Sequence, residues 1–221
     1  RAVMLENVRG FLDPGFDEYR NHIFTSIQKL GYVTHIKLLN ASDYGVPQLR
    51  PRVVIIGIRK DQIGAFAYPD ERPDSALTVG NTLRDLMAQN GWVGAKQWAS
   101  NANRIAPTLV GGSKKHGGPD LGPTRARNAW AELGVDGRGI ANEAPAPGFE
   151  GMPRLTSRMM ARIQGFPDTW TFGNRKTVAC RMIGNAFPPP VARAVGERIK
   201  ECLEHGCIDS EREISLSQAV V

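Results

Sequence analysis

Apolar runs separated by polar breaks along residues 1–61 predict strands and one helix. We expect strands at residues 2–5, 34–39 and 53–58, the first of them buried and parallel within its sheet. Between the first two, four apolar residues recur at helical spacing: Tyr19, Ile23, Ile27 and Leu30. This order of elements predicts an α/β fold, the second half of a doubly wound, Rossmann-like sheet.

Residues 62–153 have a different character. Gly, Pro, Asn and Ser become frequent, the periodicity is poor, and one short helix is expected at residues 82–89. Four large aromatic residues argue against disorder, which is poor in aromatics: Trp92, Trp98, Trp130 and Phe149. We therefore predict a small, ordered, loop-rich module of the kind that carries recognition.

Helical spacing returns in residues 154–206. Met159, Met160 and Ile163 predict a helix with a core-facing side, ended by Gly165. A last helix should begin at the prolines near residue 189 and end at Gly206, burying Val191, Val195, Ile199 and Cys202. We expect an α/β part at 1–61, a loop-rich part at 62–153, a return to the α/β part at 154–206 and a frayed tail at 207–221.

The charge of the chain favours an acidic partner. The net charge is +6 and the pI is about 9.5 over 221 residues, so nucleic acid is the first candidate, and a merely basic protein is the alternative. Between residues 96 and 130 the basic residues face a single acid, Asp120: they are Lys96, Arg104, Lys114, Lys115, Arg125 and Arg127.

The cysteines and the apolar runs bear on metal binding, on membrane insertion and on the expected compartment. Cys180, Cys202 and Cys207 lack metal-ligand spacing, so no metal site is expected. No apolar run in the sequence is long enough to cross a membrane, and we expect no signal peptide. A reducing cytoplasm is the expected compartment.

The run Gln48-Leu49-Arg50-Pro51-Arg52 carries candidate chemistry. Pro47 and Pro51 push the chain into extended geometry, in which alternate side chains share a face. Gln48, Arg50 and Arg52 should then project to one side, where they suit phosphate or the polar edge of a base. A solvated, charged approach to a strand is the alternative.

Two further motifs stand near the two ends of the chain. Glu6-Asn7-Val8 follows the first predicted strand, and the carboxyl end of a parallel strand is where open α/β sheets bind ligands. Gly184-Asn185-Ala186 is expected to form a tight turn that leads into the last helix. An ordinary helix-entry turn is the alternative for this second motif.

In this order the motifs resemble the DNA cytosine-5 methyltransferases. That family carries Glu-Asn-Val, then Gln-x-Arg-x-Arg, then a variable target-recognition segment, then Gly-Asn. Arg154-Leu155-Thr156 and residues 162–168 match the segment before the last motif. Each tripeptide alone is weak evidence, whereas the ordered set, which covers nearly the whole chain, is strong evidence.

The resemblance implies an enzyme that transfers a methyl group from S-adenosylmethionine to C5 of a flipped cytosine. Glu6 matches the carboxylate that binds the N3 and N4 edge of the base; donation to N3 requires a pKa raised by burial. Arg52 matches the arginine that holds O2 of the cytosine and the nearby backbone. In supporting roles, Asn7 should hold the backbone around Glu6, while Gln48 and Arg50 should hold the site loop and contact phosphate.

The resemblance also implies residues for the cofactor and for double-stranded DNA. Gly184, Asn185 and Ala186 match the family's C-terminal contribution to the methyl-donor pocket. Thr108 and Leu109 resemble the Thr-Leu pair of the recognition domain. The basic residues expected to contact DNA, each of which could instead be a solvated charge, are Lys114, Lys115, Arg125 and Arg127.

The chain departs from the family in lacking the Pro-Cys nucleophile and the Gly-rich donor loop, both upstream of Glu-Asn-Val. Cys180 follows Ala179 rather than a proline, so it is no substitute. Met159 stands where relatives often carry an acid, and Met182 where they often carry Gln. The chain therefore resembles the C-terminal half of the enzyme, as an excised fragment or a natural split subunit, and should be inactive without an N-terminal half.

Two other readings remain open at this point. The chain could be a non-catalytic DNA-binding subunit or module derived from such an enzyme. It could also be an unrelated α/β hydrolase or nucleotide-binding fragment, but no phosphate loop and no Gly-x-Ser-x-Gly motif supports that. A restriction–modification setting is expected for the enzyme, with a solitary methyltransferase as the alternative.

Overall fold

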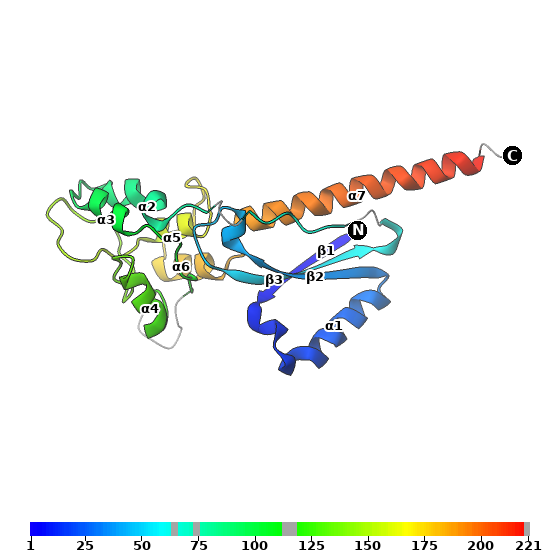
Figure 1. The fold of residues 1–221 in the computed structure, drawn as a ribbon, viewed down its shortest axis with the longest axis horizontal. Coiled ribbons are helices and arrows are strands. Elements are labelled where there is room, and N and C mark those ends of the chain that lie inside the picture. The colour runs from blue at the N-terminus through cyan, green and yellow to red at the C-terminus, as the bar shows by residue number, and fades with distance from the viewer. Residues whose placement is uncertain (63–65, 73–75, 112–118, 219–221) are drawn as a thin grey trace. The chain divides into compact units, whose positions relative to one another are not determined.

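The computed structural model describes residues 1–62, 66–72, 76–111 and 119–218, with side chains described as far as residue 204 (Figure 1). The chain divides into two compact units. The first comprises Arg1–Leu39, Pro51–Glu71 and Val191–Val221, and the second comprises Asn40–Arg50 and Arg72–Pro190.

The first unit is built on a three-stranded sheet in the order β1-β3-β2. The strands are β1 (Ala2–Val8), β2 (Tyr32–Asn40) and β3 (Pro51–Arg59), so the three predicted strands are confirmed and each is longer than expected. The expected parallel direction of the first strand is wrong, because β1 pairs with β3 antiparallel, with Glu6 opposite Val54. β3 follows β2 after residues 41–50, which contain the 3-10 turn η3 (Ala41–Tyr44), and takes the place between β2 and β1. No crossover helix lies in this connection, whereas a parallel neighbour usually needs one.

Helices lie on both sides of this sheet, α1 (Asp17–Lys29) on one and α7 (Pro189–Gln218) on the other (Figure 1). On the α1 side the contact is close at Gly57, where a Cβ would stand 2.8 Å from Val3 Cγ1 and 3.3 Å from Ile27 Cγ2. Phe11, Val53 and Ile55 form a small core cluster of this unit. The sheet is therefore a helix-covered α/β layer centred on β3.

Burial in the first unit follows the position of each strand. Residues 53–58 of β3 are buried, as expected of a central strand. The expected burial of β1 is wrong: Leu5 is 39% exposed and Val8 is 54% exposed. The reason is that β1 lies at an edge of the sheet, with β3 as its neighbour on one side.

Two helices of the first unit differ from expectation at their ends. Tyr19 and Leu30, predicted to lie on the apolar stripe of α1, are exposed. The last helix does not stop at Gly206 but continues to Gln218, since a single glycine costs a helix only about 1 kcal/mol and no proline follows. Val191, Val195 and Cys202 of α7 are buried as predicted, whereas Ile199 is only half-buried.

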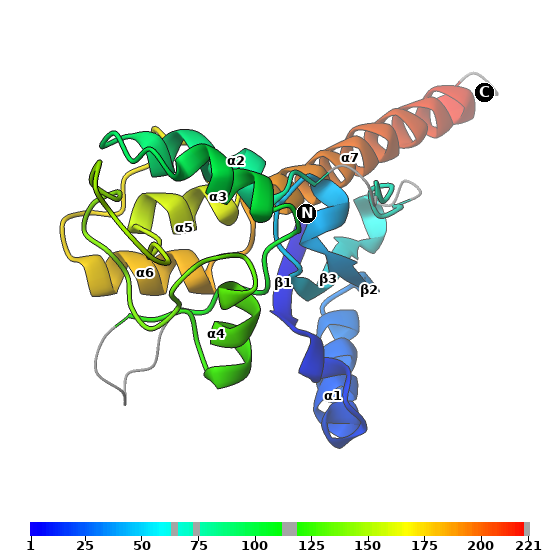
Figure 2. The ribbon, with the colours of Figure 1, turned by 60° about the vertical axis from the view of Figure 1, so that its left-hand side comes forward.

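The second unit is helical. Its helices are α2 (Val79–Ala88), α3 (Ala95–Asn101), α4 (Thr124–Ala131), α5 (Ser157–Ile163) and α6 (Lys176–Asn185). α2 contacts α3 and α5, and α5 contacts α6, so α5 lies between its neighbours (Figure 2). The predicted short helix at 82–89 is α2, which begins earlier because the Thr78 hydroxyl accepts the backbone N–H of Asn81 as a cap.

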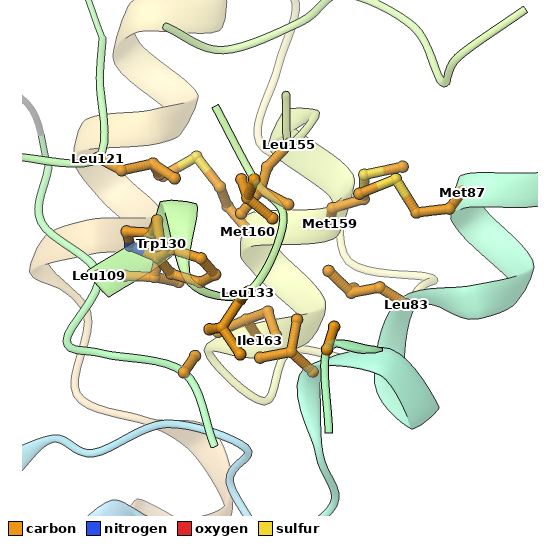
Figure 3. Packing of buried hydrophobic residues seen from close by; sticks show 14 of the residues in the cluster. Leu83, Met87, Leu109, Leu121, Trp130, Leu133, Leu155, Met159, Met160 and Ile163 are labelled. Carbon is orange, nitrogen blue, oxygen red and sulfur yellow. The ribbon is translucent and has the colours of Figure 1, made fainter. Parts of the chain in front are cut away.

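One hydrophobic core holds the second unit together (Figure 3). Trp130 of α4, Met160 of α5 and Leu83 of α2 are fully buried in it. Trp92 and Trp98 are buried as well, so this part of the chain is an ordered module. The core also includes α5 and α6; residues 154–190 therefore pack in the same compact unit as the loop-rich part. The assignment of residues 1–61 and 154–206 to a catalytic part, and of residues 62–153 to a recognition part, stays a prediction.

Met159 has two roles at the start of α5. Its side chain is 1% exposed, which confirms the expected core position. Its sulfur also lies 3.4 Å from the Thr156 backbone nitrogen, which donates to it, while the Thr156 hydroxyl accepts from the Met159 N–H at 3.2 Å. A thioether thus takes the place of the carboxylate or amide usual in a capping box.

Candidate active site and recognition segment

Glu6 and Arg52, the two residues predicted to be catalytic, form an ion pair. Arg52 Nε lies 2.6 Å from Glu6 Oε1, and the side chains are 12% and 27% exposed respectively. In the β1–β3 register Val8 is paired with Arg52, and Glu6 is paired with Val54. Glu6 and Arg52 are therefore diagonal neighbours on one face of the sheet. Burial lowers the pKa of Arg52, and the Glu6 charge opposes that shift.

The position of Glu6 differs in detail from the prediction. β1 continues to Val8, so Glu6 lies within the strand and not beyond its end. Asn7 is exposed, and its Oδ1 accepts the N–H of Val8 at 2.9 Å. This local bond fits the expected role of Asn7 in holding the backbone beside Glu6.

Gln48 and Arg50 are fully buried in the second unit, each at 0% exposure. Gln48 Oε1 accepts the N–H of Leu109 at 2.8 Å. Arg50 donates to the carbonyl oxygens of Leu109 at 2.8 Å and Gly184 at 2.7 Å. The prediction that they contact phosphate does not fit this burial. Nor do they share one open face with Arg52, because their polar groups are turned into the second unit.

A residue without a predicted role, Gln164, completes this network. It is 0% exposed, its Oε1 accepts from Gln48 Nε2 at 2.7 Å, and its Nε2 donates to the Ala186 carbonyl at 2.5 Å. The sequence signals were its place in the matched segment 162–168 and its position directly after the core residue Ile163. The network joins residues 48–50, the Leu109 backbone and the end of α6.

Gly184 is needed for close packing. A Cβ at this residue would stand 2.3 Å from the Gly111 nitrogen and 2.4 Å from the Val110 carbonyl carbon. The motif forms the last turn of α6 and not the predicted tight turn, with Asn185 as the final helical residue. The space beside Gly184 is filled by the chain itself, whereas Asn185 is exposed and Ala186 is half-buried.

The recognition residues fall into three groups. Thr108 Oγ1 donates to the Leu49 carbonyl at 2.5 Å, while Leu109 is fully buried in the core, so a contact between its side chain and DNA does not fit. Arg125 is exposed on α4, and Arg127 is half-buried and donates to Thr124 Oγ1 at 3.1 Å. Lys114 and Lys115 lie outside the described residues.

Cys180 is unsuited to nucleophilic attack. Its thiol is buried, and this burial raises its pKa above the usual value, although Ser157 Oγ at 3.5 Å and Lys176 oppose the shift. In the described residues, no group of three or more His, Cys, Asp or Glu side chains could hold a metal ion. The described helices include none with the length and apolar character to cross a membrane.

These features define a chain of the cytosine-5 methyltransferase class. The family model for C-5 cytosine-specific DNA methylases matches residues 1–201, and the chain belongs to this family. It is 57% identical over 206 residues to the Type II methyltransferase M.NaeI of Lentzea aerocolonigenes, covering 92% of this chain and 50% of that protein. It is 49% identical over 207 residues to the Type II methyltransferase M.NgoMIV of Neisseria gonorrhoeae, covering 92% and 65%.

Solved structures agree on the fold. A prophage-encoded DNA modification methyltransferase from E. coli matches with a TM-score of 0.54 at 21% identity, over 92% of this chain and 70% of that one. The Dnmt2 methyltransferase of S. pombe matches with a TM-score of 0.51 at 15% identity, over 92% and 66%. The mixed α/β architecture is thus a Rossmann-like methyltransferase fold, and the chain spans only half to two-thirds of the two curated relatives described above.

Proposed function

We propose that this chain is the C-terminal, DNA-recognising part of a DNA cytosine-5 methyltransferase. The complete enzyme transfers a methyl group from S-adenosylmethionine to C5 of a cytosine flipped out of a duplex. It acts on chromosomal DNA in the cytoplasm of a prokaryote, in a restriction–modification system, as the Type II names of its relatives suggest. The observation that carries the proposal is the Glu6–Arg52 pair.

The pair suits the polar edge of cytosine. Glu6 would bind N3 and the N4 amino group, and Arg52 would donate to O2. The present ion pair joins only Arg52 Nε and Glu6 Oε1, at 2.6 Å. The second carboxylate oxygen of Glu6 and the Nη2 group of Arg52 would be the atoms that bind the base, while the ion pair holds the two side chains beside each other.

The chemical step needs a thiolate, and the two cysteines whose side chains are described, Cys180 and Cys202, are both buried. Attack of a thiolate on C6 makes C5 nucleophilic, and neither a carboxylate nor an arginine can replace that covalent step. Cys180 is buried, and its pKa is raised by burial. We therefore propose that the chain alone is inactive and that an N-terminal half, in the same chain or in a separate subunit, supplies the nucleophile.

The first unit offers a surface for that half. β1 is at the edge of the described sheet, so its outer N–H and C=O groups have no strand neighbour among the described residues. Leu5 and Val8 are exposed on the same strand. An added strand would satisfy the backbone groups and cover these side chains. Completion of the sheet along β1 is therefore part of the proposal.

Only part of the motif Gly184-Asn185-Ala186 has room for contact with the methyl donor. The space at Gly184 is occupied by the backbone of Val110 and Gly111, so Gly184 acts through packing. Asn185 is exposed and Ala186 is half-buried, and they remain the candidates for contact with S-adenosylmethionine. When bound, the donor supplies the methyl group, and most of its pocket would come from the N-terminal half.

The test is methyl transfer with and without the missing half. The chain is incubated with duplex DNA and a radiolabelled donor, alone, and then with the N-terminal half of a close relative added in trans or fused. We expect incorporation at cytosine only in the second case. Incorporation by the chain alone would overturn the inactive-part assignment. DNA binding without any methyl transfer, even with the added half, would instead indicate the non-catalytic module.

A further inference from the structure

The second unit contains a polar cavity that has no place in methyl transfer. It has a volume of about 750 Å³. It lies between the C-terminal end of α2, residues 141–144, the first residues of α5, and residues 172–179 at the start of α6. None of the residues with a predicted role in catalysis, donor binding or DNA binding lines it.

Two cations in its lining are held in place without being neutralised. Arg158 donates to the Trp170 carbonyl at 2.7 Å, and Lys176 donates to the Ile140 carbonyl at 2.9 Å and to Asn142 Oδ1 at 2.8 Å. Carbonyl oxygens fix the side chains but carry no net charge. Among the described residues, neither cation forms an ion pair with a carboxylate.

Two arginines close to Arg158 in the sequence do form ion pairs with carboxylates. Arg154 is paired with Asp136, and Arg162 is paired with both Asp85 and Asp168. Other cations of the unit, such as Arg125 and Arg175, also form no ion pair among the described residues, so what distinguishes Arg158 and Lys176 is that they line a cavity and are held there by neutral acceptors. An anion entering the cavity would meet two pre-positioned donors, at a low cost in side-chain ordering.

The rest of the lining is mostly polar, with three alanines, one aromatic ring and one acid. Gln89 and Asn174 contribute amides that offer both donors and acceptors. Phe172 lines the cavity and packs edge-on against Phe166, with ring centroids 4.9 Å apart. Glu143 is the one acid in the lining, so the lining carries two positive charges and one negative charge.

We infer that this cavity binds a nucleotide unit, with its phosphate on Arg158 and Lys176 and its base against Phe172 within reach of the amides of Gln89 and Asn174. An excess of one positive charge suits a single phosphate group, and Glu143 disfavours a polyphosphate. Amide side chains read base edges, and rings accept any base by stacking. The unit could be a free nucleotide or a residue of a single strand, and the chemistry of recognition is the same.

The test uses the 221-residue chain itself and does not depend on methyl transfer. Its backbone amide NMR shifts are followed with three probes: inorganic phosphate, a nucleoside monophosphate and a thymidine tetranucleotide. We expect saturable shifts at residues lining the cavity with the nucleotide probes, at about millimolar affinity or better, and at least about tenfold weaker binding of phosphate. A stronger response to the monophosphate indicates a free nucleotide, and a stronger response to the tetranucleotide indicates a strand.

Matched variants make the assignment falsifiable. Arg158→Gln and Lys176→Gln should each weaken nucleotide binding about tenfold, and Asn174→Ala, at an exposed position, several-fold. Arg175→Gln removes the same charge from an exposed residue outside the lining and should leave the affinity within about twofold. Nucleotide binding no stronger than phosphate binding, shifts elsewhere, or equal effects of Arg175→Gln and Arg158→Gln would overturn the inference. If the cation variants fail to fold, an unchanged affinity of Asn174→Ala overturns it.

Discussion

Gly184 lies so close to Gly111 that a Cβ on Gly184 would stand 2.3 Å from the Gly111 nitrogen. Because that neighbour is backbone, it cannot rotate away as a side chain would. Gly184→Ala should therefore lower the free energy of unfolding by about 2–4 kcal/mol, through overpacking at a buried contact. The measurement is urea denaturation followed by tryptophan fluorescence.

Gly196→Ala is the matched control for this change. It is also a helical glycine, but nothing lies within 4 Å of its Cβ position. Here alanine should stabilise the chain by about 0.5–1 kcal/mol, the ordinary helix propensity difference. Similar effects of the two substitutions would mean that the Gly184–Gly111 contact is not tight.

Arg50→Met should be strongly destabilising. It removes the donors to the carbonyls of Leu109, Gly184 and Ala186 within a fully buried network. We expect a loss of about 3–5 kcal/mol, because several buried acceptors lose their partner at once. Arg125→Met, on the exposed face of α4, should change stability by no more than about 0.5 kcal/mol. A mild effect of Arg50→Met in the same denaturation assay would contradict the role of the network.

Asp136 should make stability depend on pH in acid. Hydrogen bonds from Arg138, followed by Arg154, lower the pKa of Asp136 to about 2. A carboxyl whose pKa is lower in the folded state stabilises the fold above its unfolded pKa of about 3.9, and this contribution is lost as the pH falls toward 2. Asp136→Asn should cost about 1 kcal/mol above pH ~4, since both arginines are solvent-exposed.

The measurement is the melting temperature of wild type and Asp136→Asn from neutral pH down to acid. The two curves should run parallel above pH ~4 and converge below it. Asp120→Asn, which changes the same charge where no ion pair is formed among the described residues, should lower the melting temperature less at neutral pH. If the difference in melting temperature between wild type and Asp136→Asn grew in acid, the predicted direction of the pH dependence would be wrong.

Glu6→Ala should depress methyl transfer in the reconstituted enzyme by about 10²–10⁴-fold, the usual range for a lost acid–base group. Turnover is measured with a labelled donor on a duplex that contains the target sequence of the relative used. Glu18→Ala, at the exposed start of α1, is the control and should keep near-full turnover. Near-full turnover of Glu6→Ala would remove Glu6 from the catalytic site.

DNA binding should be weak and salt-sensitive, centred on residues 96–127. If about five phosphates are neutralised, log K should fall against log salt with a slope of roughly −4 to −5. Replacing Lys114 and Lys115 together by Ala should reduce the slope by up to about two units. Replacing Arg193 and Lys200, which pair with acids on α7, removes the same charge and should leave the slope unchanged. Fluorescence anisotropy on duplex DNA measures both, and equal slopes for wild type and the Lys114/Lys115 variant would exclude this pair from the interface.

Local patterns in the sequence predicted much of the fold. Apolar runs located the strands, and helical spacing located α1, α5 and the start of α7, because each signal depends on neighbouring residues only. The direction of the first strand was predicted wrongly, since an apolar run reads the same in a parallel and an antiparallel sheet. The exposure of Leu5 was missed for a similar reason: it depends on which strands are neighbours.

The candidate site was likewise predicted only in part. Glu6 and Arg52 were predicted as functional partners, and the register of β1 and β3 brings them together. The burial of Arg50 was not predicted, because its acceptors lie 59 residues away at Leu109 and 134 residues away at Gly184. Spacing along an extended segment shows which side chains share a face but not what covers that face.

The anchoring of Leu109 by Gln48 and Arg50 bears on attempts to change the target sequence by exchanging segments between relatives. The amide and carbonyl of Leu109 are held by side chains that lie outside the variable stretch. Gly111, two residues later, must also meet Gly184. A graft that starts before Leu109 would replace one side of this contact while leaving the other, whereas a graft that starts after Gly111 would inherit the anchor intact. Chimeras with the later junction are therefore the ones that should transplant a new specificity without loosening the host fold.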